Sequence, residues 1–151
     1  ATKYGITARE AARYGITDIR AMSIDQAKAI YYQGYWLLSG ADRIISKYIA
    51  AELFDSSVLH GPGTAGTFLQ KAHNLLFPSA IPLKIDGAVG PKTLAAVNSQ
   101  LPRWEKAFLN AMTGEQYIFF KNIVTLDPSQ HEFFKGWVGK RLDVPDDAQE
   151  A

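Results

Sequence analysis

Four acidic side chains are the first candidates for acid–base chemistry in this sequence: Glu10, Glu52, Asp55 and Asp86. Cleavage of a glycosidic bond requires a protonated carboxyl beside the leaving oxygen, usually with a second carboxylate or a positioned water. Glu52 and Asp55 are three residues apart and share one face of a predicted helix. The favoured interpretation of Asp55 is a hydrogen bond to a neighbouring helix end, because most buried polar groups are structural. Glu10 fits a helix-capping box with Thr7 and Asp86 fits a turn, so none of the four predicts a general acid by itself.

Other kinds of catalytic or binding site are poorly supported. His60, His73 and His131 lie far apart without ligand-like partners at helical spacing, so we expect ordinary surface or core roles rather than a metal site. Cysteine is absent, and no nucleophile elbow of the Gly-x-Ser-x-Gly type occurs. The stretch "GPGTAG" could present backbone N–H groups to an anion, but it lacks the lysine of phosphate-binding loops. A corner between two helices is the favoured interpretation, and no cofactor is predicted.

Helical patterns position these residues along most of the chain. Two capping boxes, Thr7 to Glu10 and Ser23 to Gln26, predict helix starts. The first helix should end at Gly15 and the second near Gly34, because glycine is favoured after the last helical turn. A third helix is predicted over about 41–59, and "HGPG" separates it from a fourth.

Apolar residues at helical spacing predict the buried faces of these helices. The set is Ile24, Ala27, Ile30, Tyr31, Ile45, Tyr48, Ile49, Leu53, Phe68, Leu69, Ala72, Leu75 and Leu76. No convincing β-strand alternation is seen, and the echo between "KYGIT" and "RYGIT" is too short for a structural repeat. The fold class predicted from these patterns is all-α.

The second half of the chain continues the helical pattern. A loop rich in proline and glycine precedes a helix that should begin at Pro91, and residues 101–126 predict one or two helices with Gly114 as the break. Asp127 and Pro128 predict the start of a last helix that ends near Lys140, and a loose polar tail follows. Exposed aromatic faces bind carbohydrate, but helical spacing places most aromatic residues of this half in a core. They are Trp104, Phe108, Tyr117, Phe119, Phe120, Phe133, Phe134 and Trp137.

Length and composition indicate a globular protein without a nucleic-acid or membrane partner. Of 151 residues, 47% are hydrophobic and 21% charged, which is sufficient for a real core. Sixteen basic and fifteen acidic residues give a net charge of +1, whereas nucleic acids and anionic membranes select a basic excess. No apolar run approaches the roughly 18 residues of a membrane span.

Five separate stretches resemble the glycoside hydrolase family 108 muramidases. "ATKYGIT" is similar to the segment after that family's acidic, glycine-rich start, and "IDQAKAIYYQGYW" to its helix ending in a Tyr-Trp pair, here Tyr35-Trp36. "LFDSSVLHGPGTAGTFLQKA" resembles its helix, Gly-Pro-Gly corner and following helix. "IDGAVGPKTLAAVN" resembles the Asp-Gly-x-x-Gly-Pro-x-Thr-Leu signature of the small peptidoglycan-binding module behind it, and "FFKGWVGKR" its closing helix. The order and spacing of these pieces extend the resemblance from Ala1 to about Arg141.

The resemblance implies a lysozyme-like helical fold with a small C-terminal helical subdomain. The muramidase lobe would cover 1–77, the peptidoglycan-binding helical module 78–141 and a polar tail 142–151. The implied activity is that of an endolysin-like lysozyme, which hydrolyses the bond between N-acetylmuramic acid and N-acetylglucosamine in bacterial peptidoglycan by general acid catalysis, without a cofactor. The implied location is the periplasm or cell wall, reached by secretion or phage lysis.

The resemblance also implies where the site lies. In the family a Glu-Gly-Gly-Tyr motif precedes the segment matching "ATKYGIT", and its Glu is the general acid. No such motif occurs in this sequence, so the acid is expected ahead of Ala1. The candidate substrate-binding residues are Thr2, Lys3, Tyr4, Gly5 and Thr7, joined by Asp55 and His60 if the third helix backs the same groove. Plain turn and core packing is the alternative interpretation of Thr2 and Tyr4.

Two other functions stay open on the sequence alone. A non-catalytic peptidoglycan-binding protein would keep the groove but lack the acid. A secretion-accessory protein would use its aromatic face for a protein partner. The residues encoded ahead of Ala1 discriminate the enzyme from the binding protein, because only the enzyme needs an acid there.

Overall fold

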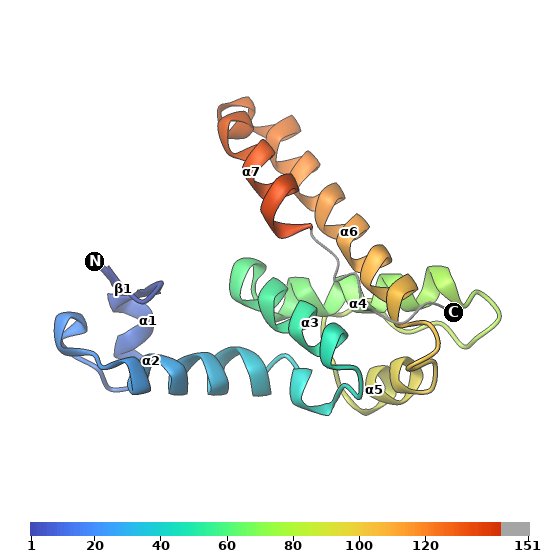
Figure 1. Ribbon diagram of the computed structural model, residues 1–151, viewed down its shortest axis with the longest axis horizontal. Coiled ribbons are helices and arrows are strands. Elements are labelled where there is room, and N and C mark those ends of the chain that lie inside the picture. The colour runs from blue at the N-terminus through green and yellow to red at the C-terminus, as the bar shows by residue number, and fades with distance from the viewer. Residues whose placement is uncertain (143–151) are drawn as a thin grey trace.

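The structure is a computed structural model that describes residues 1–142, and its secondary structure is helical apart from one short hairpin (Figure 1). The all-α fold predicted from the sequence is confirmed. The expected polar tail falls almost wholly on residues 143–151, which lie outside the described residues. In chain order the elements are β1 (Thr2–Lys3), β2 (Ile6–Thr7), α1 (Ala8–Ala12), η1 (Ile19–Ala21), α2 (Ile24–Tyr31), η2 (Tyr32–Leu37), η3 (Ala41–Arg43), α3 (Lys47–His60), α4 (Pro62–Leu76), α5 (Pro91–Asn98), α6 (Glu105–Leu126), η4 (Pro128–Gln130) and α7 (His131–Arg141).

Residues 1–31 form a small N-terminal lobe with a core of its own. Thr7 caps α1 by accepting a hydrogen bond of 3.1 Å from the Glu10 N–H. Ser23 and Gln26 form the complete capping box predicted at the start of α2. The buried apolar residues of the lobe are Ile6, Ala11, Ile19, Met22, Ala27 and Ile30. From this lobe α2 carries the chain to the remaining helices (Figure 1).

The hairpin at the start of the chain is a feature that the sequence patterns do not predict. β1 and β2 pair antiparallel, with Thr2 opposite Thr7. Tyr4 and Gly5 form the turn with φ values of 53° and 80°, both positive as a two-residue hairpin turn of type I′ requires. Strands of two residues are too short to give an alternating pattern. In the echo "RYGIT" the chain instead leaves α1, with Gly15 at φ 77°, so the two copies adopt different structures.

The second helix does not end near Gly34, and that prediction is wrong. The helix continues through this glycine as the π-helix η2. Gly34 leaves room for Tyr14, because a Cβ at position 34 would lie 2.5 Å from the Tyr14 hydroxyl oxygen. The chain turns only at Gly40, whose φ is 83°. Because π-turns are rare and frequently occur at functional sites, the junction of α2 and η2 is a candidate part of a site.

The main core lies among α3, α4, α5 and α6. Gly61, at φ 92°, separates α3 from α4, and Pro62 opens α4, as "HGPG" predicts. The core includes the fully buried side chains of Ile49, Leu53, Leu69, Phe108 and Met112. Three residues of the predicted buried set are instead exposed, namely Ile24 at 54%, Ile45 at 63% and Leu75 at 76%. Each lies at or just before a helix end, where neighbouring elements no longer cover the face.

Of the two arrangements predicted for 101–126, the structure shows a single helix, α6. Gly114 does not break it, and no atom lies near the place where its Cβ would be. Asp127 caps the next turn by accepting a hydrogen bond from the Ser129 N–H, as predicted, and α7 returns along α6. Phe120 and Trp137 stack between the two helices with ring centroids 4.9 Å apart. The first half of α6 packs in the main core, whereas its second half and α7 project away from the other helices (Figure 1).

The loop between α4 and α5 has no helix or strand, but side chains of α4 hold it in place. Gln70 is buried, and its carbonyl oxygen accepts from the Gly87 N–H at 2.8 Å while its amide donates to Asp86 at 3.0 Å. Asn74 bonds both backbone groups of Leu83, at 2.8 Å each. The turn predicted at Asp86 is present. The loop is therefore fixed by amide side chains rather than by backbone pairing.

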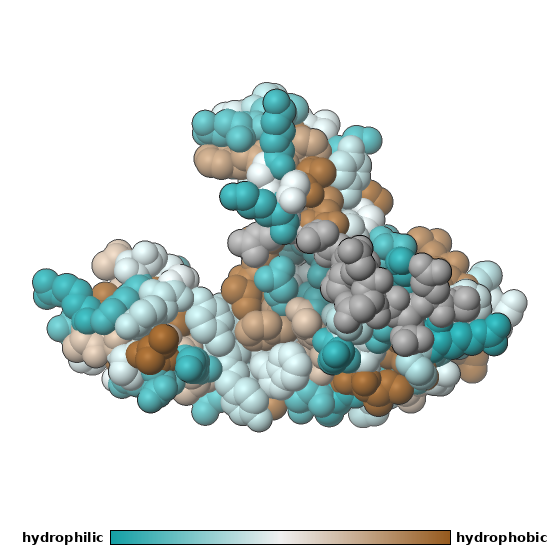
Figure 2. Space-filling model, in the orientation of Figure 1, coloured by the Kyte–Doolittle hydropathy of each residue, from teal (hydrophilic) through white to brown (hydrophobic). Residues whose placement is uncertain are grey.

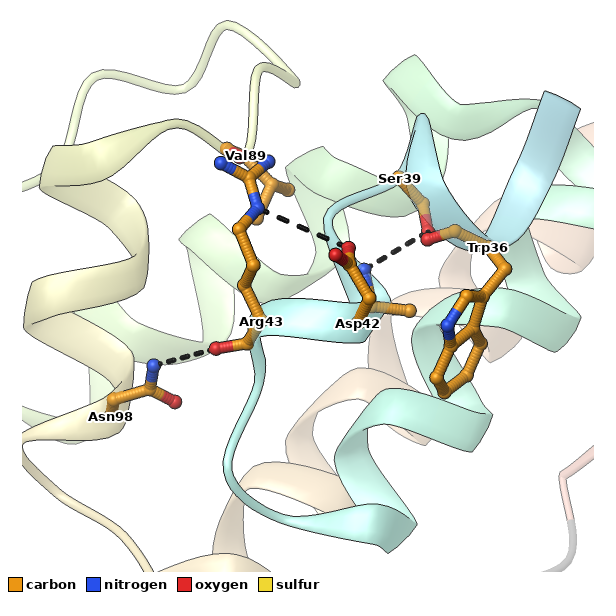
Figure 3. A network of polar contacts seen from close by, with 7 residues as sticks. Trp36, Ser39, Asp42, Arg43, Val89 and Asn98 are labelled. Carbon is orange, nitrogen blue, oxygen red and sulfur yellow. Dashed lines mark hydrogen bonds and ion pairs between the residues drawn. The ribbon is translucent and has the colours of Figure 1, made fainter. Parts of the chain in front are cut away.

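Polar contacts also join the segment after η2 to this loop and to α5 (Figure 3). The Asn98 amide donates to the Arg43 carbonyl at 2.9 Å, and its oxygen accepts from the Ile45 N–H at 3.0 Å. The Arg43 guanidinium donates to the Val89 carbonyl at 3.5 Å and pairs with Asp42 at 3.9 Å. Residues on both sides of position 77 share these contacts, and a division of the chain there stays a prediction.

Candidate active-site groove

A groove of about 480 Å³ lies between the α2–η2 junction and α3. Its lining residues are Lys28, Tyr31, Tyr32, Trp36, Phe54, Asp55 and Val58. Trp36 from η2 and Phe54 from α3 meet edge to face, with ring centroids 5.8 Å apart. In the space-filling view, the N-terminal lobe is set apart from the α6–α7 hairpin by an open notch (Figure 2). A concave, mostly apolar surface with a few polar groups is typical of a ligand site.

The hairpin collects five of the predicted site residues: Thr2, Lys3, Tyr4, Gly5 and Thr7. Thr7 is occupied as the cap of α1, and the Lys3 ammonium donates to the Arg20 carbonyl at 2.6 Å. Tyr4 and Gly5 form the turn. The Tyr31 hydroxyl donates a hydrogen bond of 2.7 Å to the Tyr4 carbonyl. The turn is thus attached to a residue that lines the groove.

The other two predicted site residues, Asp55 and His60, lie on α3 but in different surroundings. Asp55 lines the groove. His60, at the end of α3, is not among the lining residues, and its Nε2 lies 3.1 Å from the Gln116 side-chain oxygen. Its ring packs at 4.6–5.5 Å against the rings of Phe68, Phe119 and Phe120. The structure therefore brings Asp55, rather than His60, to the groove.

Glu52 lies three residues before Asp55, in a polar cluster between α3 and α6. Its carboxylate accepts hydrogen bonds from the Gln116 amide and, at 3.3 Å, from the Ser56 hydroxyl. Burial away from water, together with the negative charge of Asp55, raises the pKa of Glu52 to about 7 despite these hydrogen bonds. A carboxyl with such a pKa is suited to proton transfer near neutral pH. Glu52 is, however, not among the residues that line the groove.

Glu10 completes only half of the predicted capping box. Its backbone N–H donates to Thr7, but its carboxylate accepts a hydrogen bond of 2.5 Å from the Tyr35 hydroxyl instead of reaching back to the cap. Burial, followed by this hydrogen bond, raises the pKa of Tyr35 to about 12, so the hydroxyl stays a donor at neutral pH. The Glu10 side chain therefore links α1 to η2, a long-range contact that a local pattern does not reveal.

Neither a metal centre nor a membrane span is found in the described part of the chain. Within residues 1–142 no group of three or more His, Asp or Glu side chains is arranged to hold a metal ion. Over the same residues, no helix combines the length and apolar character that crossing a membrane requires.

Comparison with known families decides the assignment. Residues 1–61 match Glycosyl hydrolase 108, and residues 65–142 match the Predicted Peptidoglycan domain. This chain belongs to the family of the Predicted Peptidoglycan domain, and its first 61 residues are similar to glycosyl hydrolase 108. At the family level it is a peptidoglycan hydrolase with peptidoglycan as its partner, as the sequence resemblance implies.

A solved structure supports the fold. The structure described as "Structure of Brucella abortus SagA" is similar to this chain with a TM-score of 0.73 and 24% sequence identity, covering 93% of this chain and 74% of that one. The likeness shows that the two chains share a fold, and the lysozyme-like helical fold expected for the glycosyl hydrolase 108 family is confirmed. Among curated proteins the comparison finds no match.

The aromatic lining is the part of this groove that sequence reasoning missed. Tyr31, Tyr32 and Trp36 fall in "YYQGYW", where the helical pattern predicts a helix end. Four of these six residues are aromatic, more than the single buried face of a helix can take up. This density was the sequence signal that some of the rings line a surface groove. Phe54, on the opposite wall, gives no such signal because it lies within an ordinary apolar helix.

Proposed function

We propose that this chain hydrolyses the bond between N-acetylmuramic acid and N-acetylglucosamine in bacterial peptidoglycan by general acid catalysis. One observation carries the proposal: every residue that lines the groove lies within 1–61, the range that matches glycosyl hydrolase 108. A glycan strand in this groove would pack its sugar rings on the aromatic faces, while a few polar groups fix its orientation.

The chemical roles in this proposal follow from the placement of the residues. The general acid is the glutamate that the sequence resemblance places ahead of Ala1. Thr2 and Lys3, which follow it in the hairpin, contact the substrate, and Thr2 orients the attacking water or the acid. Asp55 contacts the substrate from α3. Because His60 is packed among phenylalanine rings, we assign it to support of α3 behind the groove wall.

This reaction requires access to the cell wall. We therefore propose that the protein acts in the periplasm or at the wall, which it reaches by secretion or phage lysis. Fractionation of producing cells, with the protein traced by antibody, tests this location. Protein confined to the cytosolic fraction throughout growth and lysis would contradict it.

Purified sacculi provide the test of the activity. Sacculi are incubated with the protein translated from the complete open reading frame, and the soluble fragments are analysed by mass spectrometry. New reducing ends on N-acetylmuramic acid support the proposal, whereas new ends on N-acetylglucosamine indicate a different bond. Sedimentation of the protein with sacculi without any new reducing ends would instead support a non-catalytic peptidoglycan-binding protein.

A further inference from the structure

The turn of the N-terminal hairpin is strained at one residue. Tyr4 has a φ of 53°, and among residues 1–142 it is the only residue other than glycine with a positive φ. Tyrosine is disfavoured in this left-handed region, so the surroundings must hold it there. The Tyr31 hydroxyl, which donates to the Tyr4 carbonyl at 2.7 Å, is a contact that does so.

Gly5, the next residue of the turn, leaves the space that this contact needs. A Cβ on Gly5 would lie 2.7 Å from the Tyr31 hydroxyl oxygen, and the φ of Gly5 is 80°. The ring of Tyr31 also lines the groove. A single side chain therefore reaches from the groove wall to the backbone of the hairpin turn.

Tyr35, one helical turn farther along, attaches the lobe at a second point. Its hydroxyl donates to the Glu10 carboxylate at 2.5 Å, and its ring lies 5.8 Å from that of Tyr31. Burial, and then the nearby Glu10, raise the pKa of both tyrosines, so both hydroxyls remain donors at neutral pH. The hairpin and α1 are thus each bonded to the α2–η2 junction.

We propose that Tyr31 is a positioning residue for glycan cleavage, whose hydroxyl holds the hairpin so that Thr2 and Lys3 keep a fixed place relative to the groove. Tyr35 and Glu10 provide the second hold on the same lobe. This inference rests on the proposed function, which gives the hairpin its task. The ring of Tyr31 contacts substrate and its hydroxyl positions the hairpin, so the two roles are separable.

The variant Tyr31→Phe separates them, because it removes the hydroxyl and keeps the ring. In the protein from the complete reading frame, acting on soluble glycan strands, we expect kcat to fall about ten- to a hundredfold, since a displacement of about 1 Å costs that much rate. KM should change less than about twofold, because the ring is retained. Hydrogen exchange of the hairpin amides should become faster.

Two variants of Glu10 test the hydrogen bond between Tyr35 and Glu10. Glu10→Gln keeps an oxygen that accepts from the Tyr35 hydroxyl and should retain kcat, whereas Glu10→Ala should lower it with little change in KM. The matched control is Tyr117→Phe on α6, away from the hairpin. The Tyr117 hydroxyl makes no hydrogen bond within the described part of the chain, so this variant should keep wild-type kcat and hairpin exchange.

The outcomes distinguish this inference from the proposed function. A Tyr31→Phe enzyme that keeps the wild-type kcat, including one in which only KM is raised, overturns the inference alone. A wild-type protein that binds sacculi without cleaving them overturns the proposed function and the inference with it. A lowered kcat with unchanged KM and faster hairpin exchange supports both.

Discussion

The carboxyl of Glu52 is held by polar partners but is largely removed from water. Its pKa is raised from 4.5 to about 7, chiefly by burial and then by Asp55. The folded protein therefore keeps a proton on this side chain between about pH 4.5 and 7, where the unfolded chain has lost it. The contribution of this group to stability is greatest below about pH 4.5, falls as the pH rises to about 7 and is level above that.

Replacing Glu52 by glutamine should remove this loss of stability at higher pH, because the amide is neutral at every pH and keeps an oxygen for the Gln116 amide. We expect Glu52→Gln to be more stable than the wild type at pH 8, by on the order of 1–2 kcal/mol once partial solvent exposure is allowed for. At pH 4.5 the two should differ little. Urea unfolding at both pH values measures the difference.

A matched control is Glu132→Gln, which alters an exposed carboxyl in the first turn of α7 and should not raise the stability at pH 8. Equal stability of Glu52→Gln and wild type at pH 8 would contradict the prediction.

Residue roles were predictable from sequence where they depend on near neighbours. The Ser23–Gln26 capping box and the turn at Asp86 involve atoms within three residues, and both are confirmed. The carboxylate of Glu10 fits the same local pattern, but in the structure it accepts a hydrogen bond from Tyr35, 25 residues away, instead of from the cap. A local motif therefore predicts what a side chain can bind and not which partner the fold supplies.

Close approach of α4 to the following loop depends on Gly66. A Cβ there would lie 2.2 Å from the Gly87 carbonyl oxygen, a backbone atom that cannot swing aside. Gly66→Ala gains about 1 kcal/mol of helix propensity, but the overlap should outweigh it and destabilise the protein by at least about 2 kcal/mol. We expect the Tm to fall by roughly 5 °C in a thermal unfolding experiment.

Gly114→Ala is the control for this prediction. Gly114 is exposed within α6 and has nothing near its absent Cβ, so alanine should raise the Tm by about 2–4 °C. If both alanine variants raised the Tm, the close approach between α4 and the loop would not exist in solution.

Element boundaries were predictable where chain chemistry alone decides them. Pro91 begins α5, because the first residue of a helix needs no N–H donor. Gly61 ends α3, because glycine readily adopts the positive φ found there. The same reasoning failed at Gly34, which lies inside a helix. At Gly114, where one helix or two were left open, the structure shows the unbroken helix. Glycine marks a helix end only when no neighbouring element continues to support the helix beyond it.

On the scale of the molecule, the two family matches share one core. Ile49 and Leu53 come from the glycosyl hydrolase 108 range, and they belong to the same buried cluster as Leu69, Phe108 and Met112 from the peptidoglycan domain. We therefore expect residues 1–61 alone to leave α3 unfolded, since its buried face loses its partners. Hydrogen exchange should show no protection of the α3 amides in this fragment.

Adding residues 62–151 in trans should restore protection of those amides, because the missing half of the core is supplied. An isolated 1–61 fragment with a protected α3 would show that this half folds without the other.

The groove itself was beyond prediction from spacing. Lys28 and Asp55 line it from elements that meet only in the folded chain, and no pattern in the sequence pairs them. The family resemblance pointed to the hairpin and to Asp55 and His60 on α3. Of these predicted site residues only Asp55 lines the groove, and the aromatic wall was not foreseen. That wall depends on the π-turns of η2, which local propensity does not encode.

The two cores of the molecule are joined along the chain by the rod of α2 and η2, with one wall of the groove built on that rod and the other on α3. Tyr31 packs against the N-terminal core, whereas Trp36 and Phe54 pack against the main core, so the width of the groove depends on how the rod holds the two cores together.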